Sequence, residues 1–345
     1  MKKVIIIGGG FAGSAIAKKL ENYFDVTLID SKDYFEFTPG ILRTIVEPEH
    51  IKKVQMLHTH YLKRAKVIVG CVSEVSEKAV FVGNQKIKFD YLAICSGSRY
   101  SAPIKEMEAL TVTRAIHLRS YYERLCKAKR ILIVGGGLVG VELAAEIAEH
   151  YDDKEIIIIH SQDRLIERNH DKAVRYAYNF LKKRGVIIHL NESVKKNRGN
   201  IFHTESGREV KADIAFLCTG IKPNFDFMSR KFSKSLNNKN KVIVNEHLQI
   251  EGFRNIFAAG DITDRVEEKT AQNAERQARV VAKNITLLER KEKLKNYHSR
   301  RTPLVISLGK YNGIFSWGNF VLTGIIPGLL KSFIEFREMR KLAKN

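Results

Sequence analysis

Two apolar runs in this chain each lead into a glycine-rich turn and then into a segment with the apolar period of a helix. Residues 4–7 precede the sequence GGGFAG and residues 131–134 precede GGGLVG, so both turns follow the pattern GxGxxG. We expect a helix at 15–20 after the first turn and at 141–150 after the second. A further apolar strand follows each helix, at 24–29 and at 155–159. This repeated order predicts two βαβ units.

Three more apolar strands end in small residues: 91–95 before Ser96-Gly97-Ser98, 213–218 before Thr219-Gly220, and 255–259 before Gly260-Asp261. The carboxyl ends of strands in an open α/β sheet face the ligand, so we expect these ends to line binding sites. A helix is expected from about Ala271 to 288, with one apolar stripe. Segments 66–69, 79–82 and 85–89 suggest a small antiparallel sheet. Residues 58–60 alternate as in a strand.

The first turn carries the chemistry of a dinucleotide site. Gly8 would make the tight turn, Gly10 would let the backbone approach a diphosphate, and Gly13 would let helix and strand pack closely. The following helix directs free N–H groups at the diphosphate. Asp30 closes the next strand 22 residues after Gly8, where a carboxylate accepts both hydroxyls of an adenosine ribose.

The second turn, with Gly135, Gly137 and Gly140, has no acid at the end of its following strand. His160 stands there instead, with Arg164 nearby. An acid at this position selects NADH and repels a 2′-phosphate, so its absence leaves both NADH and NADPH open. His160 is either a cofactor contact or an ordinary loop histidine, and Gly220 closes a strand expected beside it.

The turn Gly260-Asp261 is a second candidate for flavin binding. Asp261 can hydrogen-bond a ribityl chain, and the helix that begins near Ala271 can stabilise negative charge on a reduced flavin. Gly97 ends a strand expected at the same edge. The alternative is that Asp261 only caps a turn. Glu142, early in the second fingerprint helix, is a candidate catalytic residue facing the cleft, or a carboxylate stabilised by the helix dipole.

Composition limits the partners. The 345 residues carry a net charge of +21, spread along the chain, which attracts anionic partners but also fits a solvated surface. None of the four cysteines forms a CxxC pair, which favours a reducing, cytoplasmic location and argues against a disulfide reductase. We expect no metal site and no nucleic-acid partner. Neither a signal peptide nor a bilayer-spanning run is evident, and Lys2 rules out N-myristoylation.

The C-terminal segment 308–330 is apolar and aromatic, and a basic stretch follows it. This order is typical of a segment that binds peripherally at a membrane interface. A strand and helix covering the protein's own core, or a homodimer interface, are the alternatives.

Together these motifs resemble the two-dinucleotide-binding-domain flavoproteins. The chain is most similar to the ferroptosis suppressor branch of the apoptosis-inducing-factor family, and next to the type II NADH:quinone oxidoreductases. The segments that carry the resemblance are GGGLVGVELAAEI, IIIIHSQ, AFLCTGIKPN, VNEHLQIEGFRNIFAAGDIT and SLGKYNGIFSWGNFVLTG. Gln272 lies in AQNAERQ, which is similar to the quinone-site motif AQxAxQ, although Arg276 replaces its second glutamine and Gln277 comes one place later.

The resemblance implies FAD and NADH or NADPH as cofactors and a quinone as electron acceptor. It implies FAD contacts for Gly8, Gly10, Gly13, Asp30 and Asp261, and nicotinamide contacts for Gly135, Gly137, Gly140 and Glu142. We therefore predict an α/β fold with two Rossmann-like domains. An FAD-binding domain comprises 1–107 and 223–290, an inserted NAD(P)H-binding domain 108–222, and a small C-terminal module 291–345. Alternatives are a ferredoxin or rubredoxin reductase acting on a small acidic protein, and an NADH-sensing binding protein.

Overall fold

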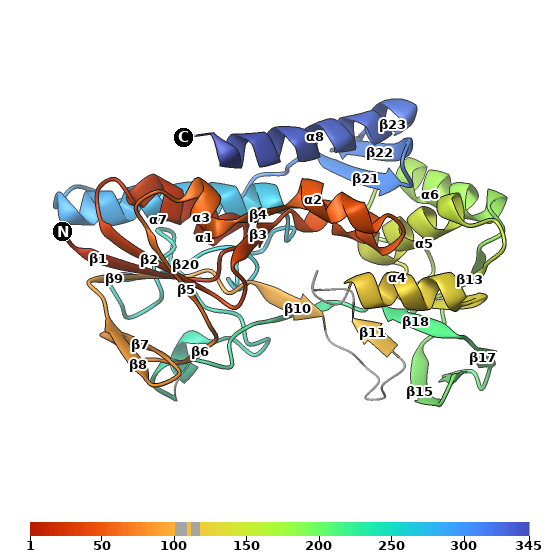
Figure 1. Ribbon diagram of the computed structural model, residues 1–345, viewed down its shortest axis with the longest axis horizontal. Coiled ribbons are helices and arrows are strands. Elements are labelled where there is room, and N and C mark those ends of the chain that lie inside the picture. Colours follow the sequence, from red (N-terminus) through yellow and green to blue (C-terminus); the bar gives the residue numbers. More distant parts are fainter. Residues whose placement is uncertain (101–108, 112–117, 229, 345) are drawn as a thin grey trace.

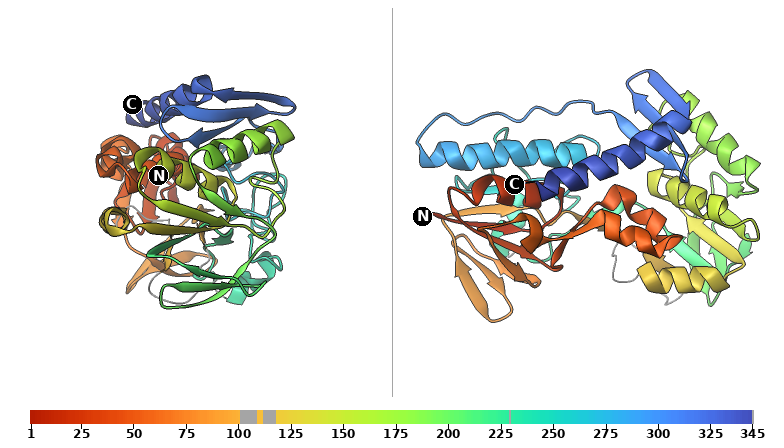
Figure 2. Two further views of the ribbon diagram at one scale, coloured as in Figure 1. Left: turned by 90° about the vertical axis from the view of Figure 1, so that its right-hand side faces the viewer. Right: turned by 45° about the horizontal axis from the view of Figure 1, so that its top comes forward.

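The computed structural model describes residues 1–100, 109–111, 118–228 and 230–344. It contains two parallel sheets, each packed against helices, and a C-terminal layer that lies over both (Figures 1 and 2). The predicted α/β class with two Rossmann-like units is confirmed.

The first sheet has the strand order β20-β9-β1-β2-β5 and is parallel throughout. Its central strands are buried almost completely, as expected for a parallel sheet covered on both faces. The two helices of this unit pack against each other along their length. The elements are β1 (Lys3–Ile7), α1 (Phe11–Leu20), β2 (Asp25–Asp30), β5 (Lys66–Val69), β9 (Tyr91–Ile94), β20 (Ile256–Ala258) and α7 (Ala271–Glu289).

The second sheet has the order β11-β18-β12-β13-β14 and is also parallel. All its strands lie between β9 and β20 in sequence, so this sheet is inserted within the first unit. Its elements are β11 (Ala109–Thr111), α4 (Leu118–Lys127), β12 (Arg130–Val134), α5 (Leu138–His150), β13 (Glu155–Ile159), α6 (Asp171–Lys183), β14 (Ile187–His189) and β18 (Ile214–Leu217).

An antiparallel sheet covers one face of the second sheet through a separate apolar core that includes Leu132, Phe202 and Val210. It consists of β15 (Val194–Arg198), β16 (Ile201–Thr204) and β17 (Glu209–Lys211). A short antiparallel pair, β10 (Ser98–Tyr100) with β19 (Ile221–Pro223), connects the two units.

The first unit contains further small elements. A two-stranded pair, β3 (Tyr34–Glu36) with β4 (Gln55–Leu57), lies beside the short helices α2 (Ile51–Val54) and α3 (His58–Tyr61). Further short helices are η1 (Thr38–Ile45), η2 (Pro48–His50) and η4 (Arg230–Ser235). An antiparallel sheet contains β6 (Val72–Val75), β7 (Ala79–Val82) and β8 (Gln85–Lys88).

The C-terminal module is a three-stranded antiparallel sheet that is followed by one long helix. Its elements are β21 (Leu304–Leu308), β22 (Asn312–Trp317), β23 (Phe320–Gly324) and α8 (Ile325–Ala343). Helix α8 packs on its own sheet and contacts α2 and α3 of the first unit, while β21 packs on α5 of the second. None of the helices in the described ranges is both long and apolar enough to cross a bilayer.

Three predicted details were wrong. Segment 66–69 is the edge strand of the first parallel sheet, and the antiparallel sheet is completed by β6 instead. Residues 58–60 form a helical turn rather than a strand. Helices α1 and α5 begin within their glycine turns, at Phe11 and Leu138, earlier than expected. The predicted boundary at 107/108 lies outside the described residues, and the other domain boundaries stay predictions.

Candidate active site

The first glycine turn closes tightly and leaves its middle open. Gly8 has φ = 95°, and a Cβ there would lie 2.3 Å from the carbonyl oxygen of Cys95. A Cβ on Gly13 would lie 1.8 Å from the carbonyl oxygen of Gly8, so neither position tolerates a side chain. A Cβ on Gly10 would meet no atom within 4 Å. The turn therefore has the shape that lets a bulky diphosphate approach the backbone.

Asp30 lies beside this turn and is fixed by two neighbours. Its Oδ2 accepts a hydrogen bond from the Gly9 amide at 2.7 Å and lies 3.5 Å from Nε2 of His58. His58 is fully buried, and its Nδ1 lies 2.7 Å from the hydroxyl of Tyr61. Burial acts to raise the pKa of Asp30, but the His58 imidazole, the Lys32 ammonium and the Gly9 amide hold it below its ordinary value. Asp30 is therefore an ionised acceptor at neutral pH.

The second flavin candidate lies close to the first turn. A Cβ on Gly260 would lie 3.5 Å from Cβ of Ala12 and 3.8 Å from Cβ of Ala274, so the turn lies between the first residues of α1 and α7. Helix α7 begins at Ala271, as predicted. The structure thus brings two helix N-termini and this turn together.

Asp261 is held next to the end of β9. Its Oδ2 accepts a hydrogen bond from the Ser98 hydroxyl at 2.8 Å. Gly97, the preceding residue, has φ = 65° and open space where a Cβ would lie. Asp261 and Gly97 therefore lie at the same sheet edge as Gly8, where the sequence placed them.

The second glycine turn repeats the first. A Cβ on Gly135 would lie 2.5 Å from the carbonyl oxygen of Cys218, and a Cβ on Gly140 would lie 1.9 Å from the carbonyl oxygen of Gly135. Gly137 faces open space, as Gly10 does. Gly220, just beyond β18, has φ = 49° and is also open.

His160 occupies in the second unit the position that Asp30 occupies in the first. The amides of Gly8 and Gly135 donate to the carbonyls of Ile29 and Ile159, each at 2.8 Å, so the two strand ends are equivalent. His160 is buried, and burial lowers the pKa of its imidazole. A neutral ring thus replaces an ionised carboxylate.

Glu142 is buried at the contact between α5 and the C-terminal module. Its Oε1 accepts hydrogen bonds from the Ser307 amide at 2.9 Å, the Ser307 hydroxyl at 3.0 Å and the Lys331 ammonium at 3.0 Å. The Glu142 and Lys331 side chains are 11% and 13% exposed, so this is a shielded ion pair. Neither Ser307 nor Lys331 was singled out from the sequence, and the only signal was the basic stretch that contains Lys331.

Glu146, one turn further along α5, joins the two units. It forms an ion pair at 3.0 Å with Arg43 of η1, whose guanidinium also donates to the carbonyl of Gly309. Burial raises the pKa of the Glu146 carboxyl, an effect that the Arg43 guanidinium only partly offsets. One helix face therefore contacts the first unit and the C-terminal module.

The two glutamines of α7 differ in their surroundings. Gln272 is exposed in the first turn of the helix. Gln277 is buried, accepts a hydrogen bond from the Gly260 amide at 2.7 Å, and donates to Glu267 at 2.6 Å. Gln277 thus supports the Gly260 turn, whereas Gln272 is free to contact a ligand.

The cysteines support the turns without redox pairing. All four are free, and Cys95 and Cys218 are buried. Burial raises the pKa of both thiols to about 12, so they stay protonated. Their carbonyls lie against Gly8 and Gly135 in the two units. No cluster of three metal-ligating side chains occurs within the described ranges.

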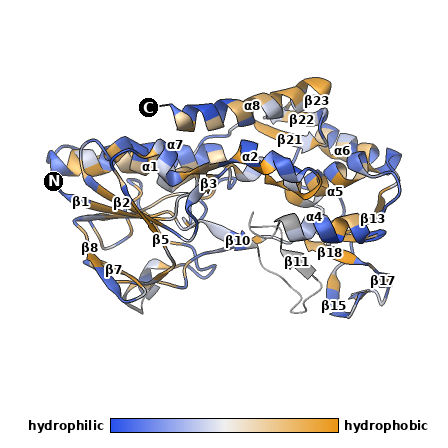
Figure 3. Ribbon diagram, in the orientation of Figure 1, coloured by the Kyte–Doolittle hydropathy of each residue, from blue (hydrophilic) through white to orange (hydrophobic). Residues whose placement is uncertain are grey.

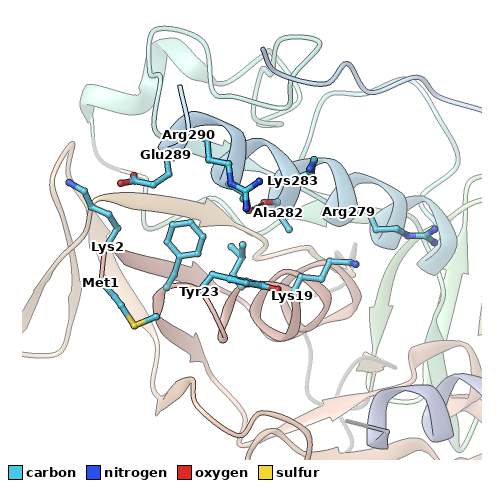
Figure 4. A pocket seen from close by; sticks show the side chains of 12 residues that line it. Met1, Lys2, Lys19, Tyr23, Arg279, Ala282, Lys283, Glu289 and Arg290 are labelled. Carbon is cyan, nitrogen blue, oxygen red and sulfur yellow. Dashed lines mark hydrogen bonds between the residues drawn. The ribbon is translucent and has the colours of Figure 1, made fainter. Parts of the chain in front are cut away.

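A cavity of about 680 Å³ lies apart from these sites. Lys2, Lys19, Tyr23 and Lys283 are among its lining residues, and Figure 4 shows Lys19 and Tyr23 on the α1 side, Lys283 on α7 and Lys2 beside the start of β1. Lys2 precedes β1, whereas Gly8 follows it, so the cavity lies at the opposite edge of the first sheet from the glycine turn.

The chain matches known proteins over nearly its whole length. Residues 2–278 match the family model described as pyridine nucleotide-disulphide oxidoreductase. Apoptosis-inducing factor homolog B of Dictyostelium discoideum is 35% identical, over 91% of this chain and 89% of the relative. Human ferroptosis suppressor protein 1 is 31% identical, over 95% and 92% of the two chains.

Solved structures share the fold at low sequence identity. The sulfide:quinone oxidoreductase of Aquifex aeolicus superposes with a TM-score of 0.88 at 20% identity, over 99% of this chain and 92% of that one. NDH2 of Plasmodium falciparum, in complex with NADH, superposes with a TM-score of 0.83 at 16% identity, over 98% of each chain.

Proposed function

The chain belongs to the pyridine nucleotide-disulphide oxidoreductase family, and we propose that it is an FAD-dependent NAD(P)H dehydrogenase that reduces a quinone. As a member of this family it uses FAD and a nicotinamide nucleotide. The observation that best supports a quinone acceptor is the buried Glu142–Lys331 ion pair. It joins α5, the helix after the second glycine turn, to the C-terminal module.

The residues fit the two cofactors. In the first unit, Gly10 leaves space for a diphosphate and Asp30 offers an ionised acceptor for ribose hydroxyls. Asp261, Gly97, Gly260 and the start of α7 at Ala271 are the groups that would hold the remainder of FAD. In the second unit, Gly135, Gly137 and Gly140 form an equivalent turn for the nicotinamide nucleotide, with Gly220 and His160 beside it. When bound, the two cofactors supply the transfer of hydride and electrons.

The Glu142–Lys331 pair gives the protein a means to handle protons. A quinone that takes two electrons also takes two protons: the hydride of the nicotinamide nucleotide accounts for one, and Lys331 can donate the other from Nζ and regain it from solvent, while Glu142 holds the ammonium in place. The Ser307 amide and hydroxyl fix the Glu142 carboxylate. We infer that the pair positions and protonates the acceptor, with exposed Gln272 as an additional contact.

The cysteines favour a small acceptor over a disulfide. Cys95 and Cys218 are buried, protonated and separated between the two units, each behind its own glycine turn. A disulfide relay needs two thiols close enough to bond to each other and at least one thiolate. Electrons would therefore pass directly from the flavin to the acceptor.

The C-terminal module exposes an unusual number of large apolar side chains. Seven are between 55% and 67% exposed. We call this set the apolar face: Trp317, Phe320, Ile325, Ile326, Leu329, Phe333 and Phe336. Figure 3 shows the hydrophobic colouring of the first turns of α8 next to β23.

A membrane surface is the partner that we propose for the apolar face. The basic residues Arg337, Arg340 and Lys341 follow it on α8, an arrangement that favours an interface with anionic lipid. Lys331 lies on the same helix, so the acceptor would reach the Glu142–Lys331 pair from lipid, where quinones dissolve. Cytoplasmic location and a homodimer through this face stay predictions.

A small acidic protein is the second candidate acceptor, because the net charge of +21 would attract one. Salt-sensitive reduction of such a protein, without reduction of quinones, would favour it over the main proposal.

An anaerobic spectral titration of the FAD-loaded protein tests the proposal. NADH and NADPH are added first, and a soluble quinone follows. We expect bleaching of the flavin by a nucleotide and full recovery of its absorbance with quinone. Bleaching without recovery would contradict the quinone acceptor, and no bleaching by either nucleotide would contradict the dehydrogenase.

A further inference from the structure

The second unit lacks a carboxylate on its strand but has one nearby on the following loop. His160 Nε2 is buried and has no hydrogen-bond partner within the described residues. It lies 3.6 Å from Oε2 of Glu167, seven residues later in the chain. The Glu167 side chain is 34% exposed, so it contacts His160 and is still accessible from solvent.

The loop that carries Glu167 is folded tightly back onto the glycine turn. The Ile166 amide donates a hydrogen bond of 2.8 Å to the carbonyl of Gly136. Leu165 is fully buried, and a Cβ on Gly136 would lie 2.5 Å from its Cδ2. The position of Glu167 is thus tied to the turn that would hold the diphosphate.

Ile166 has φ = 41°, a left-handed conformation that a β-branched residue rarely adopts. Such strain persists only where the surroundings enforce it, and it is concentrated at ligand-binding positions. Here the Gly136 hydrogen bond and the burial of Ile166 enforce it. The strained residue directly precedes Glu167 and sets the direction in which that side chain leaves the loop.

Both arginines of the loop already face carboxylates. The Arg164 guanidinium donates to Asp171 at 2.6 Å and to the carbonyl of Glu167 at 2.8 Å. Arg168 lies 3.7 Å from Oε1 of Glu167 and 4.0 Å from Glu268. A 2′-phosphate arriving here would have to displace these acids before either cation could bind it.

We propose that the Glu167 carboxylate accepts hydrogen bonds from the adenosine ribose of the nicotinamide nucleotide and makes the protein selective for NADH over NADPH. The proposal rests on the function given above, in which the second turn binds this nucleotide. Free ribose hydroxyls donate hydrogen bonds to a carboxylate, whereas a 2′-phosphate offers no such donor and repels it. His160 occupies the strand-end position where an acid is usual, and its imidazole lies against the Glu167 carboxylate.

Calorimetric titration of the FAD-loaded protein with ADP-ribose and 2′-phospho-ADP-ribose tests this. Neither probe carries nicotinamide, so the result does not depend on hydride transfer. We expect ADP-ribose to bind at least about tenfold more tightly. Glu167→Gln should reduce that ratio by about tenfold. Asp163→Asn, which removes the same charge from an exposed position on the loop, should change it by less than about twofold.

Equal or tighter binding of the 2′-phosphorylated probe by the unmodified protein would overturn the proposal. An unchanged ratio in Glu167→Gln would do the same. If neither probe binds, the proposal falls together with the nucleotide site. Normal selectivity without any quinone reduction would support the role of Glu167 and overturn only the quinone function.

Discussion

Oε1 of Glu142 lies 3.0 Å from Nζ of Lys331, although 189 residues separate them in the chain. Both side chains are nearly buried, and the pair joins α5 of the second unit to α8 of the C-terminal module. The proton-handling part of the proposed site is therefore assembled only when the C-terminal module is docked.

Replacing Lys331 with Met should lower kcat for quinone reduction at least about tenfold, about 1.4 kcal/mol in the barrier, because the ammonium at the acceptor is lost. FAD content and flavin reduction by nucleotide should change much less. Stopped-flow measurement of the two half-reactions separates these effects.

The same variant should be less stable, by about 3–5 kcal/mol, because Glu142 is left buried without its partner. The double variant Glu142→Gln, Lys331→Met should regain stability but not turnover. Lys182→Met, at an exposed position on α6, is the matched control. Normal quinone turnover in Lys331→Met would contradict the proposed role.

Replacing Asp30 with Asn should weaken FAD binding at least about tenfold, because the ionised acceptor for the ribose is lost and only a weaker neutral one remains. Flavin retained after gel filtration, and the FAD dissociation constant, measure the effect. Asp33→Asn, at an exposed position after the same strand, is the matched control. Full flavin retention in Asp30→Asn would show that the carboxylate does not contact FAD.

Replacing Ile326 and Phe333 with Glu should weaken binding to anionic phospholipid vesicles at least about a hundredfold, because each buried apolar side chain contributes about 1.5–3 kcal/mol. Activity with a soluble quinone should be unchanged, since both side chains are exposed. Val266→Glu, 96% exposed and outside the module, is the control for co-sedimentation. Undiminished co-sedimentation of the double variant would remove the membrane role of the apolar face.

His160 should make stability depend on pH. Burial holds the pKa of His160 below its ordinary value of 6.5, so the unfolded chain binds a proton at higher pH than the folded one. The stability that neutral His160 provides is present above pH 6.5 and is lost as the pH falls through 6.5 toward the folded pKa. The unfolding free energy of the native protein, relative to His160→Asn, should decrease on acidification. A difference that is constant or increases as the pH falls would contradict burial of the neutral ring.

Local pattern was enough to predict most of the fold. Apolar strands, glycine turns and helix periods lie within a few dozen residues of one another, so both βαβ units could be read from the sequence. The sheet partner of 66–69 is β2, far back in the chain, and no local signal identifies it. The same limit explains His58, which was taken for a strand residue and lies in a helical turn behind Asp30.

The candidate site was predicted where it follows from motifs and missed where it depends on tertiary contact. Glycine spacing and the Asp30 position are encoded within single units. Ser307 and Lys331, which hold Glu142, come from the C-terminal module, where the segment SLGKYNGIFSWGNFVLTG carries the family resemblance but assigns no role to a single residue. Glu167 was not predicted, because the sequence pattern for a nucleotide site has its acid at the end of the strand. Glu167 comes seven residues later, and only the folded loop brings its carboxylate next to the strand-end residue His160.

Helix α8 is attached at three points along its length: Lys331 to Glu142, Glu335 to His50, and the carbonyls near Lys341 to Lys18. In an α-helix each residue turns the chain by about 100°. A single inserted or deleted residue between Lys331 and Lys341 would therefore rotate one set of attachments away from its partners, whatever residue were chosen. We therefore expect a change in the length of this helix to be more damaging than a point substitution outside its three attachments.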